Sequence, residues 1–443
     1  MKTNCLSRTK SRNKGNKIFN LFRGKSLTKL SEISGYRLRK SGKISARSLI
    51  VGFMTMVSKK MNTYEAWAQE ISIQAGCPVS KQAVEDRMNY ETATMVRMVI
   101  EDEVRKSLSA RHPKKPGSKS KFSSIKVEDS TVINLPQELA FAFPGNVSLG
   151  RKKSQIKIHA LYNQTDNIFH FLNLHSYTTN DQSLARVALG HIQPGDLILR
   201  DMGFLILDVL PEIDKNGGFF ISRKHATIKV LDLSSEKELN LVKFLRKWRF
   251  LDQEVLIGKA QKVKMRMVAI PLPKDQASAR RRKARNDRDK RLNHDKGYYE
   301  LLGYLIFLTN VPQTKCTAEE IKDLYGLRWQ IEIIFKCWKS QFNIVKLQPQ
   351  KCNNPYRVLC MIYLWLLYIF LFQVVWFDHI KSTTKNDQHF SLLKMSRMFN
   401  AYFEKIIAGE AEGILFRLII SRCTFDKRND RINLSQKFDK IAA

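Results

Sequence analysis

The chain has 443 residues, and its apolar fraction of 43% is enough to bury a core in two or three domains, which excludes a disordered protein. Lys and Arg number 76 against 41 Asp and Glu, so the formal net charge is +35. Solubility alone needs only about 2 to 8 charges on a small domain, and the excess therefore indicates a nucleic acid as partner. The seven cysteines form no CxxC pair and no zinc-spaced Cys/His cluster, which indicates reduced thiols in the cytoplasm.

The N-terminal region is strongly basic. The first sixty residues contain sixteen Lys or Arg and one acid, without the apolar segment of a secretory signal, so we expect a cytoplasmic protein. We predict a flexible basic segment over residues 1–43 and a helical DNA-binding domain over residues 44–110. Apolar residues recur at helical spacing in Ser48–Met61 and Thr63–Ala75, and a third helix begins near Ser80. A helix-turn-helix and a small helical bundle without base readout fit this pattern equally well.

A linker and the start of a sheet follow. Residues 111–124 combine Pro, Gly, Ser and Lys without an acid, which marks a domain boundary. In residues 125–222, a helix-like stretch, Gln182–Leu189, separates the third from the fourth of five β-rich stretches. Three strands, a helix and a further strand open a ribonuclease-H-like core, so the predicted fold class is α/β with a mixed sheet. The predicted strands are Ser124–Asn134, Ile156–Tyr162, Ile168–Leu174, Asp196–Asp201 and Phe219–Ser222.

The predicted core is then interrupted. We expect an inserted β-rich and basic subdomain over residues 223–300, because short apolar pieces end in a tract, Lys274–Lys296, with ten Lys or Arg against four Asp. This tract is either a solvated surface loop or an arm that contacts DNA phosphates, and the return of a strand at Leu301–Leu308 favours the arm. Residues 301–345 are predicted to complete the core, before a helical C-terminal region over residues 346–443.

The C-terminal region contains an apolar run of membrane-spanning length. Val358–Phe377 is broken only by Gln373. A single span here would tether a basic, DNA-binding chain to a membrane, whereas helices buried in large cores are also apolar on all sides. We therefore expect a buried helix, and membrane insertion is the less favoured alternative.

The most informative segment is Ala318–Phe342, which we predict to be one long helix with Thr317 as its N-cap. At about 100° per residue, four polar side chains fall within about 60° of one another, beside the apolar stripe of this helix. A surface ion pair between Arg328 and Glu332 would use the same spacing, and on this pattern alone it is the simpler interpretation. The four residues are Tyr325, Arg328, Glu332 and Lys339.

Two aspartates continue apolar strand faces. Asp129 shares its side of the strand with Val127, and Asp201 shares its side with Leu199. An inward carboxylate is costly unless an arginine, backbone amides or a cation compensates it. Two such positions together with Glu332 fit best with a shared hard cation such as Mg²⁺, which prefers oxygen ligands.

These motifs resemble those of a known family. The helix carries a Tyr, Arg, Glu and Lys with two, three and six residues between them, and this spacing resembles the YREK signature of bacterial insertion-sequence transposases of the DDE superfamily. The segments VEDST around Asp129 and LILRDMGF around Asp201 look like the first two acidic motifs of that family. The resemblance covers about residues 120–345, and it departs from the family at Met202, where a polar or basic residue is frequent.

The resemblance implies a DNA transposase that binds the terminal inverted repeats of its element, cleaves the ends and joins them to target DNA. Two Mg²⁺ ions, replaceable by Mn²⁺, would be held by the catalytic residues Asp129, Asp201 and Glu332. The DNA phosphates would be bound by Tyr325, Arg328 and Lys339. The implied partners are double-stranded DNA of the element ends and target, and at least one further copy of the chain in the bacterial nucleoid. No small-molecule cofactor is expected.

Other functions remain open at this point. A ribonuclease-H-like nuclease without strand joining would share the first hydrolytic step, and a catalytically inactive DNA-binding derivative would share the basic surfaces. The presence of all three acids disfavours the inactive derivative. Other enzyme classes find little support, because the chain contains no GxxxxGK[ST], GxSxG or HExxH motif.

Overall fold

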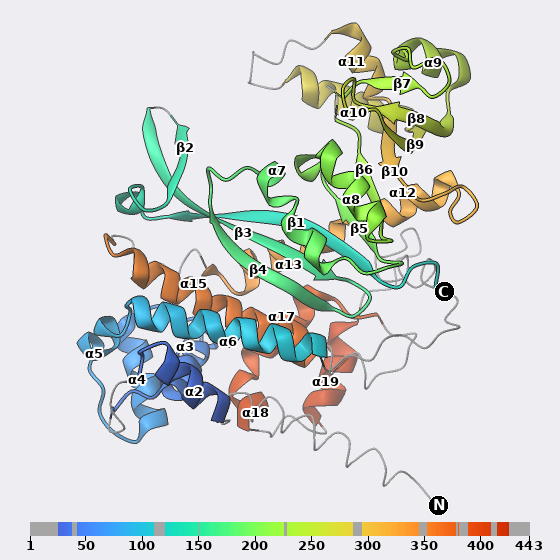
Figure 1. Ribbon diagram of the computed structural model, residues 1–443. Helices are drawn as coiled ribbons and strands as arrows, with labels where there is room; N and C mark the ends of the chain where they lie inside the picture. The colour runs from blue at the N-terminus through green and yellow to red at the C-terminus, as the bar shows by residue number, and fades with distance from the viewer. Residues whose placement is uncertain are drawn as a thin grey trace, which may run out of the picture.

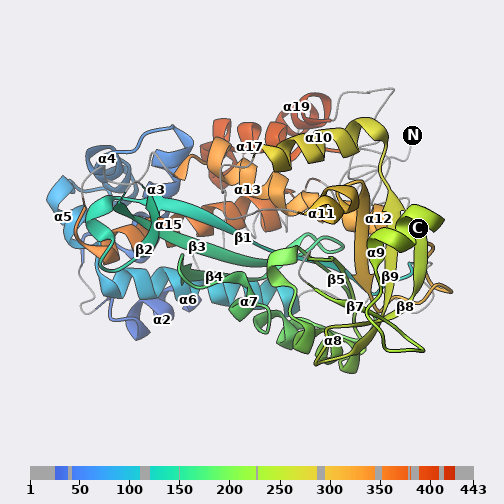
Figure 2. The same ribbon diagram turned by 90° about the horizontal axis from the view of Figure 1, so that it is seen from above.

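A mixed β-sheet forms the centre of the molecule, with helices on both of its faces (Figures 1 and 2). Its first five long strands lie in the order β4-β3-β1-β5-β6. The described parts of this computed structural model are residues 25–37, 42–109, 120–148, 150–225, 228–286, 295–344, 352–377, 380, 389–408 and 414–424.

The direction of the strands defines the fold. Strand β3 is antiparallel to both β1 and β4, whereas β5 is parallel to both β1 and β6. Three antiparallel strands continued by two parallel ones are the topology of a ribonuclease-H-like core, which confirms the predicted fold class. The short strand β2 (Pro144–Ser148), which the sequence did not predict, pairs with the first residues of β3. The long strands are β1 (Ile125–Leu135), β3 (Arg151–Asn163), β4 (Ile168–Ser176), β5 (Leu197–Arg200) and β6 (Phe219–Arg223).

The insertion after β6 extends the same sheet. Strand β10 (Tyr304–Thr309) lies between β6 and β9 and is antiparallel to both, so the strands of the insertion continue the core sheet to its far edge. The predicted strand at Leu301–Leu308 thus begins three residues later than expected. The other strands are β7 (Val230–Asp232), β8 (Leu251–Ile257) and β9 (Val263–Pro271).

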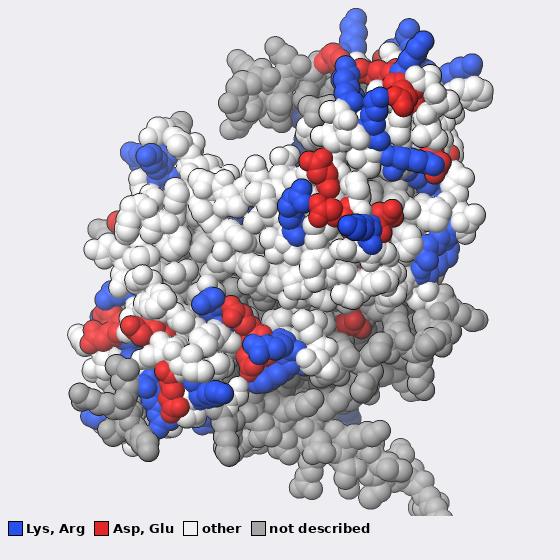
Figure 3. Space-filling view, in the orientation of Figure 1, with Lys and Arg blue, Asp and Glu red and all other residues white. Residues whose placement is uncertain are grey.

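Three helices accompany the inserted strands. The first half of the basic tract is helix α10 and not a loop, because Ala, Arg and Lys are strong helix formers, while contact of the tract with DNA phosphates stays a prediction. Residues 287–294 of the tract lie outside the described residues. Charged side chains of both signs cover the insertion at the top of the molecule (Figure 3). The helices are α9 (Leu241–Trp248), α10 (Lys274–Arg285) and α11 (Lys296–Leu301).

The N-terminal and C-terminal helices form one layer under the sheet. Helix α15 packs against α6 and α3, and buried residues of all three belong to a single core. Side-chain caps at Ser45, Thr63 and Ser80 begin α3, α4 and α5. The helices of this layer are α2 (Lys25–Ile33), α3 (Ala46–Ser58), α4 (Tyr64–Ala75), α5 (Lys81–Asp86), α6 (Tyr90–Ser109), α15 (Pro355–Phe370), the π-helix η5 (Leu371–Phe377), α17 (Leu392–Ala401), α18 (Phe403–Ala408) and α19 (Ile414–Cys423).

The apolar run of the C-terminal region lies in α15 and η5. The helical stretch Pro355–Gln373 is long and apolar enough to cross a membrane, and 72% of its most apolar window is buried inside the molecule. Trp365 and Leu366 are fully enclosed in the core. This packing accounts for the apolar composition and agrees with the prediction of a buried helix.

Each face of the sheet has its own core. Val127 and Leu199 point to the face covered by α6, α13 and α15, whereas Ile198 and Phe220 belong to a second cluster with the helices of the opposite face. The strand alternation thus sends neighbouring residues of β1 and β5 into two different environments. The opposite face carries α7 (Asp181–Leu184), α8 (Leu210–Lys215) and the short 3₁₀ helices η2 (Val187–His191), η3 (Met202–Phe204) and η4 (Leu207–Val209).

Candidate active site

Two of the predicted acids lie at neighbouring positions of parallel strands. The last paired residues of β1 and β5 are Glu128 and Arg200, and Asp129 and Asp201 are the residues that follow them. Asp201 lies just outside β5, which ends one residue earlier than the predicted strand, and its backbone is still extended. Because parallel strands run in the same direction, the two aspartates occupy adjacent register positions, Asp129 within β1 and Asp201 just beyond the end of β5.

The third acid comes from a helix that packs on β1. The segment 318–342 is two helices, α12 (Ala318–Gly326) and α13 (Trp329–Gln341), and not the single helix that we predicted. The amides of Leu327 and Arg328 bond three residues back, to the carbonyls of Leu324 and Tyr325, so the chain tightens for one turn. Gly326 favours this break because glycine costs about 1 kcal/mol in a helix interior. The predicted N-cap Thr317 is confirmed as part of a capping box with Glu320.

Arg328 brings the acids together. Its Nη1 lies 3.2 Å from Asp129 Oδ2, and its Nη2 lies 2.5 Å from Glu332 Oε1. Its guanidinium also lies over the ring of Tyr325, with 5.7 Å between the guanidinium carbon and the ring centroid. The ion pair with Glu332 and the pairing of Asp129 with an arginine were both considered as structural alternatives from the sequence, and both are present. The structure therefore brings these residues into one site without assigning their roles.

Burial and repulsion between the acids shift their protonation. Desolvation raises the pKa of Asp129 from 3.8 to about 7; Arg328 opposes the rise, and Asp201 and Glu332 add to it. Desolvation likewise raises the pKa of Tyr325 to about 12. A carboxyl group whose ionisation is opposed by two other acids is stabilised by any further positive charge.

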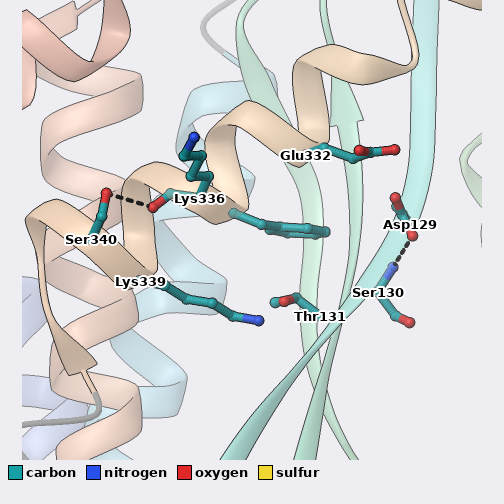
Figure 4. A pocket seen from close by; sticks show the side chains of 8 residues that line it. Asp129, Ser130, Thr131, Glu332, Lys336, Lys339 and Ser340 are labelled. Carbon is teal, nitrogen blue, oxygen red and sulfur yellow. Dashed lines mark hydrogen bonds between the residues drawn. The ribbon is translucent and has the colours of Figure 1, made fainter.

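The site opens into a cavity of about 500 Å³ between β1 and α13 (Figure 4). Glu332 points from α13 toward Asp129, and Lys339 points from the next turns of the same helix toward Thr131. Burial lowers the pKa of Lys339. Asp201 and Tyr325 do not line this cavity. Its walls are formed by Asp129, Ser130, Thr131, Glu332, Phe335, Lys336, Lys339 and Ser340, of which Asp129, Glu332 and Lys339 were predicted as site residues from the sequence.

The donor atoms suit a divalent metal ion, but they do not form a closed cage. Carboxylate oxygens are the ligands that hard cations such as Mg²⁺ prefer, and repulsion from Asp201 and Glu332 adds to the burial that raises the pKa of Asp129. Within the ranges of the chain that the structure describes, no three His, Cys, Asp or Glu side chains converge closely enough to hold a metal ion. The guanidinium of Arg328 instead lies between Asp129 and Glu332.

A buried polar network lies on the opposite face of the same strands, and the sequence analysis missed it. Glu128 Oε1 lies 3.0 Å from His159 Nε2, and Glu128 Oε2 forms an ion pair at 2.6 Å with Arg200 Nε. All three side chains are at most 1% exposed. Lys126 and Asp196 form a second buried pair, at 2.5 Å, on the same face. The signal in the sequence was the opposite charge of Glu128 and Arg200 on two predicted strands, which the structure pairs in parallel.

Comparisons with known proteins identify related sequences. The family model described as "Transposase DDE domain" matches residues 120–370. The chain is 32% identical over 270 residues to the transposase for insertion sequence element IS231D of Bacillus thuringiensis subsp. finitimus, covering 56% of each chain. It is 28% identical over 316 residues to that for IS231E of the same subspecies, covering 67% of this chain and 65% of the relative. The matches thus span just over half to about two thirds of the relatives' length.

A more distant sequence and a solved structure are also similar. The transposase for IS1151 of Clostridium perfringens is 26% identical over 306 residues, or 64% of each chain. The structure of a piggyBac transposase synaptic complex with hairpin DNA aligns with 95% of this chain and 87% of its own, at 10% identity and a TM-score of 0.47. The family model covers more than half of the chain, including Asp129, Asp201 and Glu332, and the chain therefore belongs to the transposase DDE domain family.

Proposed function

We propose that this protein is a DNA transposase that binds the terminal inverted repeats of its element, cleaves the ends and joins them to target DNA. The observation that carries the proposal is that Asp129 of β1 and Glu332 of α13 share Arg328 at a cavity lined by two lysines, with Asp201 in the next register position beside Asp129. Such a site combines groups that bind cations with groups that bind phosphate, as phosphoryl transfer requires. The acids are Asp129, Asp201 and Glu332.

Family membership implies dependence on a divalent metal ion, and we assign that ion to the three acids. Two Mg²⁺ ions, with Mn²⁺ as a substitute, would supply Lewis-acid activation of a water or 3′-hydroxyl and stabilise the departing oxygen. Asp129 would be one of the residues that hold the metal, because its carboxylate lies at the cavity and is repelled by the charges of Asp201 and Glu332. Asp201 and Glu332 would supply further carboxylate ligands to the same metal centre.

The phosphates are assigned to the other signature residues. Arg328 would orient a phosphate beside Asp129 through its planar fork of donors, and Lys339 would act as a point charge inside the cavity. Tyr325 would position the Arg328 guanidinium, which lies over its ring. Lys336, on the same helix, adds a second positive charge to the cavity wall.

The remaining regions would bind the rest of the DNA. We assign the element ends to the helical residues 44–110 and to the basic residues 1–43, of which the structure describes 25–37 and 42–43. Pairing two ends in one complex requires at least a dimer. The location that fits this activity is the nucleoid of a bacterial cytoplasm, without a membrane or a small-molecule cofactor. The other domain limits stay predictions: the linker 111–124, the core segments 125–222 and 301–345, the insertion 223–300 and the C-terminal region 346–443.

Replacing Glu332→Gln tests the metal-site assignment. We expect strand cleavage of an element-end duplex in Mg²⁺ to fall by about a thousandfold, because the amide removes a charged metal ligand. Binding of the uncleaved duplex should change by less than about twofold, since the cavity keeps its lysines. Cleavage is measured on denaturing gels and binding by fluorescence anisotropy.

The matched control is Glu319→Gln, which removes one acid from an exposed position at the start of α12. This variant should cleave like the parent protein, and undiminished cleavage by Glu332→Gln would refute the site. Cleavage without joined product, when target DNA is supplied, would instead indicate a ribonuclease-H-like nuclease. DNA binding without any cleavage by the parent protein would indicate an inactive DNA-binding derivative.

A further inference from the structure

A second cavity lies beside Met202, the residue that follows Asp201, where the insertion joins the core sheet. It has a volume of about 180 Å³ and is enclosed by the end of β6, by α10 and α11, and by β10. This is smaller than the roughly 300 to 1,000 Å³ of typical small-molecule sites, so the cavity suits one chemical group of a larger ligand. No Asp or Glu is among its lining residues, and its basic side chains are Arg223, Lys224, His225 and Arg280.

The basic side chains of this cavity differ from those on the surface of the insertion. On the surface, acids lie among the bases (Figure 3), as where Lys229 lies 2.6 Å from Glu238. In the cavity, burial and then the charge of Arg223 lower the pKa of Arg280, and burial and then Lys229 lower the pKa of Lys224 to about 8. Half-buried cations that lie close to other cations cost free energy, and a bound anion offsets this cost.

The parallel strands connect this cavity to the three acids. Arg200 of β5 is in register with Glu128 of β1 on one side and with Ser222 of β6 on the other. Ligands of open α/β sheets bind outside the carboxyl ends of such strands. Tyr325 lies close enough to both Asp201 and Arg223 for their charges to affect its pKa: Asp201 raises it and Arg223 lowers it. The next residues of the three strands form a row: Asp129, Asp201 and Arg223.

We propose that this cavity binds a backbone phosphate of the DNA strand that is cut, on the side of the scissile phosphate that faces the insertion. The inference rests on the proposed function, because it places a second phosphate next to the one at Asp129 and Asp201. Arg280 is held for this task by a hydrogen bond of 3.0 Å from its Nη1 to the carbonyl oxygen of Tyr304. Arg223 completes the cavity from the end of β6.

The test measures how single DNA phosphates couple to Arg280. The full-length protein binds a fluorescent element-end duplex without divalent metal, and uncharged methylphosphonates replace, one at a time, the phosphates flanking the cleaved bond. We expect one replacement to weaken binding by the parent protein about tenfold, and the same replacement to have no effect on Arg280→Gln. The matched control is Arg282→Gln, which removes a charge from an exposed position of the same helix and should keep the parental response.

The outcomes distinguish binding of a DNA phosphate in this cavity from the alternatives. Equal sensitivity of Arg280→Gln and the parent protein at every phosphate would overturn the proposal while leaving DNA cleavage by the three acids intact. Failure of the parent protein to bind or cleave the duplex would refute the proposed function instead. Arg280→Lys should restore the response if the charge matters, which separates binding from misfolding. Competition by inorganic phosphate that depends on Arg280, without coupling to any DNA phosphate, would show a small-anion site and overturn the assignment to DNA.

Discussion

Glu128 and Asp129 are consecutive residues of one strand, and they meet opposite environments. Glu128 is fully buried and contacts both Arg200 and His159, so its charge is matched inside the sheet. The Asp129 side chain is 18% exposed at the edge of a cavity, and its one arginine partner, Arg328, is shared with Glu332. Repulsion from two further acids adds to the burial that raises its pKa to about 7.

Glu128 therefore stabilises the sheet, whereas Asp129 and the acids near it are available to bind a ligand. A matched pair between neighbouring parallel strands fixes their register, because a shift of one residue would leave both charges buried and unpaired. That register places Asp129 beside Asp201. The unmatched acids pay for their position in stability, as functional sites frequently do. Removing the charge of Glu128 should therefore destabilise the folded protein, whereas removing the charge of Asp129 should stabilise it.

The largest effect is expected from Glu128→Ala. This change leaves Arg200 charged in an enclosed position, which costs about 3 to 5 kcal/mol of unfolding free energy. Urea unfolding followed by circular dichroism measures the loss. The double variant Glu128→Met with Arg200→Met removes both charges and should recover most of it; a loss below about 1 kcal/mol in Glu128→Ala would show that the pair is not matched as described.

A smaller effect of opposite sign is expected from Asp129→Asn. The folded protein raises the pKa of this acid from 3.8 to about 7, so the folded state holds more protons between these values and its stability falls as pH rises through them. Asn should thus stabilise the protein by about 1 to 2 kcal/mol at pH 8 and much less at pH 4. Urea unfolding at the two pH values in a chelator, with the exposed Asp208→Asn as control, tests this. A gain that does not depend on pH would contradict it.

The smallest effect is expected from Lys224→Met in the second cavity. Burial lowers the pKa of this amine from 10.5 to about 8, so the charged form destabilises the fold fully below pH 8, and this cost disappears as pH rises toward 10.5. Met should raise stability at pH 7 by about 1 kcal/mol, or roughly 2 °C in Tm by calorimetry. The exposed Lys283→Met on α10 should leave Tm unchanged. An equal shift in both variants would exclude burial as the cause.

Alternation and composition were enough to predict the central strands. Val127 and Leu199 identified the side of β1 and β5 on which Asp129 and Asp201 lie, and the structure brings these acids together as neighbours. The same reasoning assumes that the alternate positions face solvent, so it overlooked Glu128, whose neutralising partners come from other strands. Pairing across a sheet depends on register, which one strand alone does not specify.

The sequence predicted which residues of the signature helix meet, but not where helices break or how strands join. The spacing of Tyr325, Arg328 and Glu332 on an ideal helix was a good guide to their meeting, although the helix tightens at Leu327 and Arg328. The helical-wheel prediction still holds approximately, because one 3₁₀ turn changes the direction of later side chains by only a fraction of a turn. The insertion joins the core sheet through the pairing of β10 with β9. The periodicity of the sequence predicts strands but not which strands pair.

The pairing of β6 with β10 also has a consequence for how such a chain is built. Arg223 and Phe307 are antiparallel partners, so the chain leaves the core and returns to it at adjacent points, like the two sides of a hairpin stem. Everything between them therefore occupies the place of a turn, the position at which proteins best tolerate an added module. A short turn joining these strands would remove Arg280 together with the insertion's part of the second core, which includes Val255 and Met267, so the added module also stabilises the sheet that carries it.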